Sequence, residues 1–323
     1  MDCNFMITFP DDVLESYERS KNYIQKTPLN HSPSLSELIN GEVYLKLENI
    51  QKTGSFKFRG AISKITALDS DQIKKGIVTA STGNHGAAVS LAMKILNVNG
   101  KIIVPENITH NKLLNIERLG GKVEFYGNDC IESEFRAREI SKEIGSVYIS
   151  PYNDPDIITG QGTIGIELDN QLNNIDEVIV SVGGGGLISG IGGYLNQVQP
   201  EAKIIACSPK NSCVMYESLN AGRILDLPSK QTLSDGTAGG VEEGSITYDI
   251  CKEVIDDFVL VREREISLGI KNAIDDDHQL IEGSAGAAIA ALIKRKEIVK
   301  GKRVVIIICG GNINSTILQK VIS

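Results

Sequence analysis

Short runs of Val and Ile alternate with helical patterns along most of the chain, and this alternation restricts the fold more than any other feature. The runs are continuous rather than interrupted by polar residues, which is typical of strands that helices cover on both faces, hence of parallel sheets. The expected strands are 76–80, 100–105, 121–127, 177–183, 202–208 and 302–311. Helical patterns follow the first four of them, so the sequence predicts an α/β protein.

A stretch rich in Pro, Gly and Asp, "YISPYNDPDIITGQG" (148–162), separates two regions of strand–helix alternation. Such a stretch is suited to a chain crossing between domains. We therefore predict two open, twisted, mostly parallel sheets flanked by helices, with the active site in the cleft between two domains. The large domain is expected to be discontinuous, from 1–70 and 150–323, and the small α/β domain to span 71–149.

The composition excludes several classes of protein. Hydrophobic residues make up 41% and charged residues 23% of the 323 residues, which is ordinary for a globular protein. A net charge of −8 argues against nucleic acid or an anionic membrane as partner. Apolar runs such as 304–309 are too short to span a bilayer, and the first twelve residues lack the pattern of a secretory signal.

The cysteines and histidines point to neither disulfides nor a metal. The cysteines are Cys3, Cys130, Cys207, Cys213, Cys251 and Cys309. They contain no C-x-x-C pair, so we expect reduced thiols and a cytoplasmic protein. The four histidines are not in metal-ligand spacing, so no metal is expected.

Four consecutive glycines, in "SVGGGGLISGIGG" (181–193), stand between an expected buried strand and a helical pattern. Glycines cost chain entropy and add no packing, so a run of four needs a reason. One reason is close approach of backbone N–H groups to an anion such as a phosphate at a helix N-terminus. The other is a tight turn with close packing. Neither a P-loop nor a G-x-G-x-x-G pattern is present, so the common nucleotide motifs do not apply.

Two further strand ends carry polar or reactive side chains. "STGNHGAA" (81–88) offers helix-capping residue types and reads either as a plain cap or as a second anion site, for a carboxylate. "VVIIICGGN" (304–312) brings Cys309 to the carboxyl end of a strand, where ligands of open α/β sheets bind, although a buried structural cysteine is the alternative.

One lysine, Lys57, lies between two phenylalanines in "TGSFKFRG" (53–60). Phe56 and Phe58 are expected to desolvate its ammonium partly, and desolvation lowers a lysine pKa toward the range in which the amine is a nucleophile. The alternative is an amphipathic stem with its head in water. A nucleophilic lysine, a phosphate cradle and a polar strand end together describe a site for pyridoxal phosphate.

In these residues the chain resembles the fold type II (tryptophan synthase beta-like) pyridoxal phosphate enzymes, in the branch of the serine/threonine dehydratases and serine racemases. The resemblance covers almost the whole chain. It is carried in order by segments 19–37, 43–61, 81–86, 151–168, 181–190, 232–240, 254–266 and 306–314.

The resemblance implies roles for single residues around the cofactor. Lys57 is expected to hold it as a Schiff base and, once substrate displaces it, to act as the base at Cα. Phe56 would pack against the pyridine ring, Asn84 would hydrogen-bond its 3′ oxygen, and Cys309 matches the position facing the ring nitrogen. The phosphate would be bound by the backbone N–H groups of Gly183, Gly184, Gly185, Gly186 and Leu187.

The resemblance also implies a substrate site and a partner. The loop that holds the substrate carboxylate in relatives matches Ser81, Thr82, Asn84 and His85. Gly236 lies in "SDGTAGG", which lines the substrate side in relatives. The expected partners are an amino acid substrate and a second copy of the chain in a homodimer.

The implied reaction is the loss of the β-hydroxyl from L-threonine, L-serine or a related 3-hydroxy amino acid, giving a 2-oxo acid and ammonia. One alternative is an amino acid racemase with side β-elimination activity, because Thr82 stands where racemases have a proton-returning serine. Ser208 stands where racemases begin a divalent-cation site with glutamate, so we expect that site to be absent or weakened. A third reading is a non-catalytic phosphate-binding module.

Overall fold

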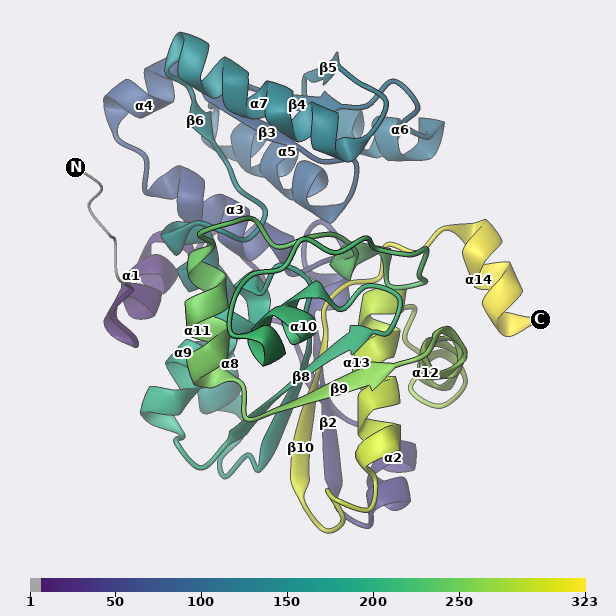
Figure 1. Cartoon of the computed structure of the whole chain (residues 1–323). Coiled ribbons are helices and arrows are strands. Elements are labelled where there is room, and N and C mark those ends of the chain that lie inside the picture. The colour runs from purple at the N-terminus through teal and green to yellow at the C-terminus, as the bar shows by residue number, and fades with distance from the viewer. Residues whose placement is uncertain (1–6) are drawn as a thin grey trace.

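The computed structural model describes residues 7–323, and two α/β bodies can be followed in Figure 1. The sequence expectations for Cys3 and for the first six residues lie outside the described part. The larger body contains a six-stranded sheet in the order β1-β2-β10-β7-β8-β9. Its strands are β1 (Leu29–His31), β2 (Glu42–Leu47), β7 (Glu177–Ser181), β8 (Lys203–Pro209), β9 (Asp257–Val261) and β10 (Arg303–Ile308). Only β1 pairs antiparallel to its neighbour; the other pairings are parallel.

The smaller body contains a four-stranded, all-parallel sheet in the order β5-β4-β3-β6. Its strands are β3 (Ile77–Ala80), β4 (Gly100–Val104), β5 (Val123–Phe125) and β6 (Val147–Tyr148). The predicted fold class, two mostly parallel sheets flanked by helices, is confirmed. The small-domain boundaries 71–149 enclose these strands, and we keep them and the large-domain ranges 1–70 and 150–323 as a proposal.

Helices cover the sheets of both bodies (Figure 1). Those of the smaller body, with the helix that precedes them, are α3 (Lys57–Thr66), α4 (Ser70–Lys75), α5 (Asn84–Leu96), α6 (His110–Arg118) and α7 (Cys130–Ile144). Those of the larger body are α1 (Asp11–Ser20), α2 (Pro33–Ile39), α8 (Pro155–Gln171), α9 (Gly186–Val198), α10 (Val214–Ala221), α11 (Ile246–Val254), α12 (Glu263–Asp275), α13 (Gly283–Arg295) and α14 (Ser315–Ile322). Two 3₁₀ turns, η1 (Glu48–Ile50) and η2 (Asp235–Thr237), lie in connections.

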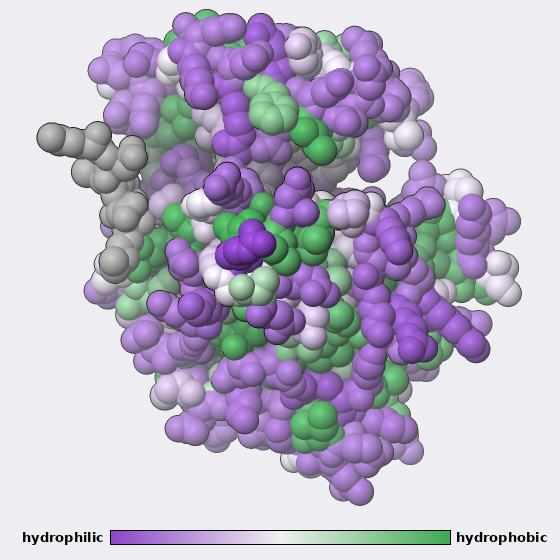
Figure 2. All heavy atoms as spheres, in the orientation of Figure 1, coloured by the Kyte–Doolittle hydropathy of each residue, from purple (hydrophilic) through white to green (hydrophobic). Residues whose placement is uncertain are grey.

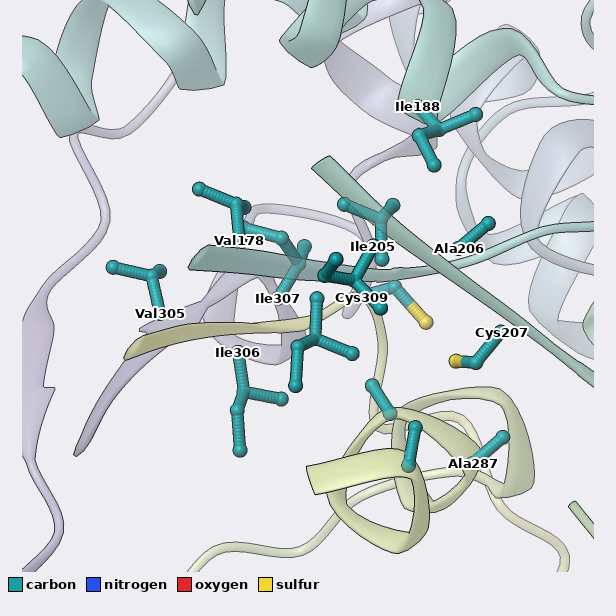
Figure 3. Packing of buried hydrophobic residues seen from close by; sticks show 14 of the residues in the cluster. Val178, Ile188, Ile205, Ala206, Cys207, Ala287, Val305, Ile306, Ile307 and Cys309 are labelled. Carbon is teal, nitrogen blue, oxygen red and sulfur yellow. The ribbon is translucent and has the colours of Figure 1, made fainter. Parts of the chain in front are cut away.

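The main core lies where β10, β7 and β8 are covered by α9 on one face and α13 on the other. Figure 3 shows Ile205 and Ile306 of the sheet between Ile188 of α9 and Ala287 of α13. All four side chains are fully buried, and each isoleucine stabilises the fold by about 1.5–3 kcal/mol. Burial on both faces is the physical reason why these strands are continuous Val/Ile runs.

All six predicted strands are present, and the helical patterns after the first four are α5, α6, α7 and α9. The stretch 148–162 is expected to cross between domains, but its second half is the start of α8. The Asp154 side chain accepts hydrogen bonds from the N–H groups of Asp156 and Ile157, and Pro155 occupies the first helical position. Pro and Asp therefore mark a helix start here, and only 149–154 crosses between the sheets.

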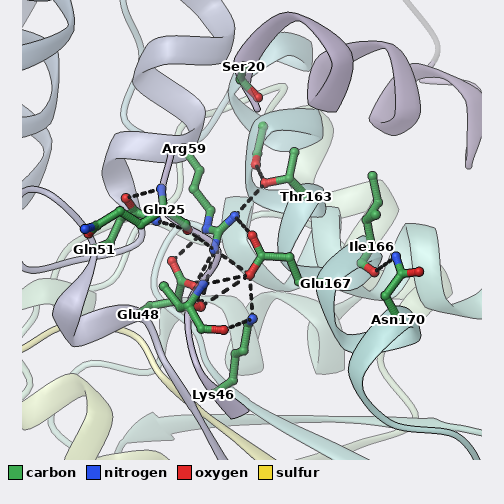
Figure 4. Close-up of polar contacts among 12 residues, drawn as sticks. Ser20, Gln25, Lys46, Glu48, Gln51, Arg59, Thr163, Ile166, Glu167 and Asn170 are labelled. Atoms are coloured by element: carbon green, nitrogen blue, oxygen red, sulfur yellow. Dashed lines mark hydrogen bonds and ion pairs between the residues drawn. The ribbon is translucent and has the colours of Figure 1, made fainter. Parts of the chain in front are cut away.

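A buried group of four charged side chains joins β2, α3 and α8 (Figure 4). Arg59 binds Glu48 through Nε at 2.7 Å and Glu167 through Nη1 at 2.7 Å, and Lys46 donates to Glu167 as well. At most 2% of each side chain is exposed, and two positive charges balance two negative ones. We call Lys46, Glu48, Arg59 and Glu167 the buried quartet. It fixes α3, whose first residue is Lys57, against α8.

Candidate active site

A cavity of about 880 Å³ lies between the two bodies and is lined from both. In Figure 2 this face is mostly hydrophilic, and green hydrophobic residues show at the waist between the upper and lower parts. The cavity lining contains every residue to which the sequence assigned a cofactor or substrate role: Phe56, Lys57, Ser81, Thr82, Asn84, His85, Gly183, Gly184, Gly185, Gly186, Leu187, Gly236 and Cys309. The geometry thus brings all of them together, and their individual roles stay predictions.

Lys57 is the first residue of α3, and its amine reaches into the cavity. Nζ donates a hydrogen bond of 2.7 Å to the carbonyl oxygen of Pro151 and lies 5.2 Å from the ring centre of Phe56. Burial lowers the pKa of Lys57 to about 8, because desolvation penalises the ammonium. Roughly a tenth of the amine is therefore neutral and nucleophilic at pH 7, far more than for a lysine in water.

Backbone contacts fix the start of α3 against the end of β10. The N–H of Phe56 donates to the carbonyl of Cys309 at 3.0 Å, and Ser55 forms an isolated β-bridge with Gly310. The N–H of Gly311 donates to the carbonyl of Gly54 at 2.9 Å. These bonds set Lys57 and Cys309 as neighbours in one wall of the cavity.

The expectation that both phenylalanines flank the amine of Lys57 is half wrong. Phe58 is fully buried in the core of the smaller body, where it packs among residues such as Ile62. Successive residues of an α-helix point about 100° apart, so Phe58 cannot share the cavity face with Lys57. Only Phe56 contributes a ring beside the amine.

The glycine run forms the turn between β7 and α9, and close packing explains its lack of side chains. A Cβ atom at Gly183 would lie 2.8 Å from the carbonyl oxygen of Thr237, and one at Gly184 would lie 2.5 Å from the ring of Tyr152. Gly185 has a φ of +88°, in the left-handed region that favours glycine. The turn is thus tight, which is one of the two readings of the sequence.

The same turn also fits the other reading, an anion cradle. Among residues 7–323, no backbone or side-chain acceptor takes a hydrogen bond from the N–H groups of residues 183–187. These groups lie at the N-terminus of α9, border the cavity, and sit where the helix dipole favours negative charge. A phosphate fits this set of donors.

Asn84 begins α5 and connects the two bodies. Its Nδ2 donates to both carboxylate oxygens of Glu282, at 2.9 and 3.1 Å, and its Oδ1 accepts from Nδ2 of Asn312 at 2.7 Å. Both ends of the amide are therefore fixed by residues of the larger body. A fixed amide can recognise one polar atom of a ligand with a defined orientation.

The loop before α5 carries the residues predicted to hold a substrate carboxylate. Ser81 accepts from the N–H of Gly83 at 3.2 Å, and Thr82 lines the cavity. His85 is different, because its Nε2 lies 3.1 Å from Thr79 Oγ1 and from the Ile149 carbonyl, inside the smaller body. Burial lowers the pKa of His85 to about 3, so its ring is neutral and supplies no cation to a carboxylate.

Cys309 follows β10 directly and is buried, with Sγ 3.5 Å from Ser181 Oγ and 4.0 Å from Glu282 Oε1. Burial raises the pKa of Cys309 far above neutrality, so it remains a thiol. Gly236 lies in η2, where a Cβ atom would be 2.8 Å from Ser284 Oγ and 3.3 Å from Glu282 Oε1.

Three residues of the site were missed by the sequence reasoning: Tyr152, Glu282 and Asn312. Tyr152 packs on the glycine turn, and Asn312 and Glu282 hold Asn84. An acid directly before the small-residue stretch "GSAGAA" and an asparagine directly after "CGG" were visible signals. Neither signal indicates a site without knowledge of the partner.

The stretch 206–214, where the resemblance located the racemase cation site, has its polar groups engaged elsewhere. Ser208 donates to the Val182 carbonyl at 2.6 Å, and Ser212 Oγ lies 2.8 Å from Ser229 Oγ. The weakening of that cation site stays a prediction.

A lysine of lowered pKa and a helix N-terminus with open N–H groups, together in one cavity, define an enzyme whose cofactor carries an aldehyde and a phosphate. Residues 21–310 match the family model described as pyridoxal-phosphate dependent enzyme. The chain belongs to this family, and its cofactor is pyridoxal phosphate.

Similar proteins are found among both sequences and solved structures. The chain is 39% identical over 318 residues to an L-threonine ammonia-lyase of Thermotoga maritima, covering 98% of this chain and 79% of that protein. It is 37% identical over 306 residues to the catabolic L-threonine dehydratase TdcB of Escherichia coli K12, covering 94% and 93%. The solved structure of maize serine racemase aligns with a TM-score of 0.92 at 32% identity, covering 98% and 97%. No helix in the described part of the chain has the length and apolar character needed to cross a membrane.

Proposed function

We propose that the protein is an ammonia-lyase that acts on L-threonine, L-serine or a related 3-hydroxy amino acid. Loss of water and subsequent hydrolysis convert such a substrate into a 2-oxo acid and ammonia. The observation that carries the proposal is the amine of Lys57, with its pKa lowered to about 8, in the same cavity as the open N–H groups of the glycine turn. The names of the most similar sequences support the lyase reaction.

The proposal gives the residues of the cavity the following roles, which their positions allow. When bound, the cofactor captures the substrate's amino group and accepts the electron pair left on Cα as its proton departs. The N–H groups of residues 183–187 bind the phosphate, and Phe56 packs beside the ring. The neutral amine of Lys57 takes the Cα proton. Cys309, a neutral thiol, would face the ring nitrogen without keeping it protonated, and this would favour prompt loss of the β-hydroxyl.

The substrate is held at the start of α5. The loop residues Ser81 and Thr82 and the first residue of the helix, Asn84, border the cavity. A carboxylate at this helix N-terminus is stabilised by backbone N–H groups and by the helix dipole. Gly236, in η2, lines the same cavity and borders the side chain of the amino acid in this proposal.

The test is reconstitution followed by product analysis. Protein loaded with pyridoxal phosphate should be yellow and should release 2-oxo acid from L-threonine or L-serine. Lys57→Ala should lose covalent attachment, judged by borohydride reduction and mass mapping, and lose at least ~100-fold in kcat as expected for a missing general base. The matched control Lys52→Ala, an exposed lysine nearby, should behave as wild type. Protein that stays colourless would favour the non-catalytic phosphate-binding module.

A second candidate reaction is amino acid racemisation with side elimination. It is favoured by one observation, the hydroxyl of Thr82 in the cavity lining, which offers a second proton carrier besides Lys57. The assay that follows 2-oxo acid should follow the D-enantiomer in the same sample. More D-product than oxo acid would make the racemase the better assignment.

We also propose a homodimer in the cytoplasm. The five cysteines in the described part of the chain are all free thiols, which suits a reducing compartment. Light scattering at several protein concentrations measures the assembly directly.

A further inference from the structure

Glu282 is a buried carboxylate in the cavity wall that the proposed reaction leaves without a role. It stands at the N-terminus of α13 and is only 4% exposed. Within residues 7–323, no lysine, arginine or histidine forms an ion pair with it. Burying an ionised carboxylate without an opposite charge is costly. The presence of Glu282 at this buried position therefore needs an explanation.

Its hydrogen-bond partners are neutral and belong to the site. Asn84 donates to both carboxylate oxygens at 2.9 and 3.1 Å, and the N–H of Asn312 donates to Oε2 at 3.3 Å. Asn312 also donates its side-chain amide to Oδ1 of Asn84. The three residues form a closed group in which Glu282 determines which way the amide of Asn84 points.

Two glycines leave space for this carboxylate. A Cβ atom at Gly310 would lie 2.7 Å from it, and one at Gly236 would lie 3.3 Å from its Oε1. Neither glycine has the positive φ that would otherwise require the residue type. A side chain at either glycine would crowd the carboxylate, so both glycines keep free the space that Glu282 occupies.

The electrostatics connect Glu282 to the amine of Lys57. Burial raises the pKa of Glu282 to about 7, Asn84 lowers it, and the charge of Asp235 raises it. The thiol of Cys309 and the ammonium of Lys57 are the other titratable groups that face it. The negative charge of Glu282 in turn opposes the lowering of the Lys57 pKa that burial causes. The charge of each group therefore shifts the pKa of the other in the direction that favours the charged form.

We propose that Glu282 is a positioning residue of the cofactor site, which orients the amide of Asn84 and places its negative charge in the wall of the cavity that Lys57 also lines. This inference rests on the proposed function, in which Lys57 binds the cofactor. Only the neutral amine condenses with an aldehyde; the amine nitrogen bonds to the carbonyl carbon, and the carbonyl oxygen leaves as water. The charge of Glu282 thereby sets the pH at which the apoprotein takes up pyridoxal phosphate.

The test measures uptake of the cofactor rather than turnover. Apoprotein is mixed with pyridoxal phosphate between about pH 6 and pH 9, roughly one unit beyond the two pKa values on either side, and the appearance of the yellow colour is timed. Glu282→Gln removes the charge and keeps the shape, so the midpoint of the rate profile should fall by about half a unit. Between about pH 7, above which wild-type Glu282 is ionised, and the midpoint, this variant should load up to ~3-fold faster than wild type.

Two further variants separate charge from orientation. Glu282→Asp keeps the charge but shortens the reach to Asn84, so it should retain the wild-type midpoint and bind the cofactor more weakly. Glu243→Gln, an exposed acid, is the matched control and should change neither quantity. An unchanged midpoint in Glu282→Gln, with Lys57 still forming the adduct, would overturn this inference alone. Adduct formation by Lys57→Ala would instead overturn the proposed function.

Discussion

At the scale of single residues, burial places two ionisable groups of one cavity near neutrality. Burial lowers the pKa of Lys57 to about 8 and raises that of Glu282 to about 7, because in each case water no longer solvates the charged form. A lysine and a glutamate that differ so much in water thus become close in proton affinity. Proton transfer at the site then requires little free energy from either group.

The raised pKa of Glu282 predicts how stability changes with pH. The folded state binds the proton of Glu282 more tightly than the unfolded state does. The contribution of this proton to the free energy of unfolding is therefore fully present below pH 4.5, the ordinary pKa of a glutamate, and is lost as pH rises through about 7. The loss is on the order of 3 kcal/mol for a shift of this size. Glu282→Gln removes this pH-dependent loss. The variant should therefore become more stable relative to wild-type apoprotein as pH rises from about 5 to about 8, a range roughly as wide as the pKa shift itself.

Urea unfolding of both apoproteins at the two pH values measures this difference. Glu243→Gln serves again as the control, because an exposed acid has no comparable shift to lose. The same stability difference between variant and wild type at both pH values would contradict the assignment of a buried, titrating carboxylate.

Which residues could be predicted from the sequence depends on how local their signal is. Lys57 and the glycines of 183–186 lie in short, unusual stretches, so their chemistry is visible without the fold. Glu282 is 198 residues from Asn84, and its function depends entirely on that partner. Phe58 was misjudged because two residues adjacent in sequence lie on different faces of a helix.

At the scale of elements, the turn from β7 to α9 owes its shape to Tyr152 as well as to its glycines. In Gly184→Ala the new methyl group would meet the Tyr152 ring at 2.5 Å, so ring and turn must separate. Because the N–H groups of the turn are proposed to bind phosphate, the variant should bind pyridoxal phosphate about tenfold more weakly, roughly the loss of one charge-assisted hydrogen bond.

The double variant Gly184→Ala with Tyr152→Leu tests this explanation, since the smaller side chain makes room for the methyl group. Equilibrium titration of apoprotein with the cofactor should show partial recovery of affinity compared with Gly184→Ala alone. Additive losses in the double variant would mean that the contact with Tyr152 does not shape the turn.

The buried quartet joins β2, α3 and α8, and removing one of its charges should be costly. Glu167 receives hydrogen bonds from both Arg59 and Lys46, so Glu167→Gln leaves two buried cations with a single carboxylate, Glu48. We expect a loss of about 3–5 kcal/mol in unfolding free energy, measured by urea denaturation. Glu15→Gln, which breaks an exposed pair with Arg19, should cost less than about 1 kcal/mol. Equal losses would show that burial does not matter here.

Within residues 7–323, six of the ten strands could be predicted because burial on both faces imposes continuous apolar runs, and with them the four helices α5, α6, α7 and α9. The start of α8 could not be predicted from Asp154 and Pro155, because Asp and Pro occur in turns as well as at helix N-termini. What distinguishes the two cases is whether the Asp154 side chain reaches the N–H groups of Asp156 and Ile157, which is a property of the folded backbone.

At the scale of the whole molecule, the cavity is closed by pairs that reach from one body to the other. Asn84 meets Glu282 and Asn312, and Arg138 of α7 donates to Glu242 of the larger body at 2.7 Å. The sequence predicted a cleft between two domains, because the alternation of strands and helices occurs twice. It could not predict these pairs, because residues 104 to 228 positions apart meet only once the two sheets are in place.

The pair of Arg138 and Glu242 is connected to the glycine turn. The N–H of Glu242 donates to the hydroxyl of Tyr152 at 2.9 Å, and the ring of Tyr152 packs against Gly184. The Tyr152 side chain thereby connects Glu242, which takes part in the contact between the two bodies, to the proposed phosphate site at Gly184. The pair is partly exposed, so its stabilisation is about 0.2–1 kcal/mol and falls as salt screens it.

Glu242→Gln should therefore weaken the binding of pyridoxal phosphate by up to about fivefold at low salt, the equivalent of the upper end of that range. The difference from wild type should shrink as salt is raised, because screening removes the charge attraction from the wild type alone. Arg136→Met is the matched control, since Arg136 pairs with Glu139 and Glu143 of its own helix. Titrations of the three apoproteins at low and high salt give all six affinities. If Arg136→Met weakens binding as much as Glu242→Gln does, the effect comes from net charge and not from a contact between the two bodies.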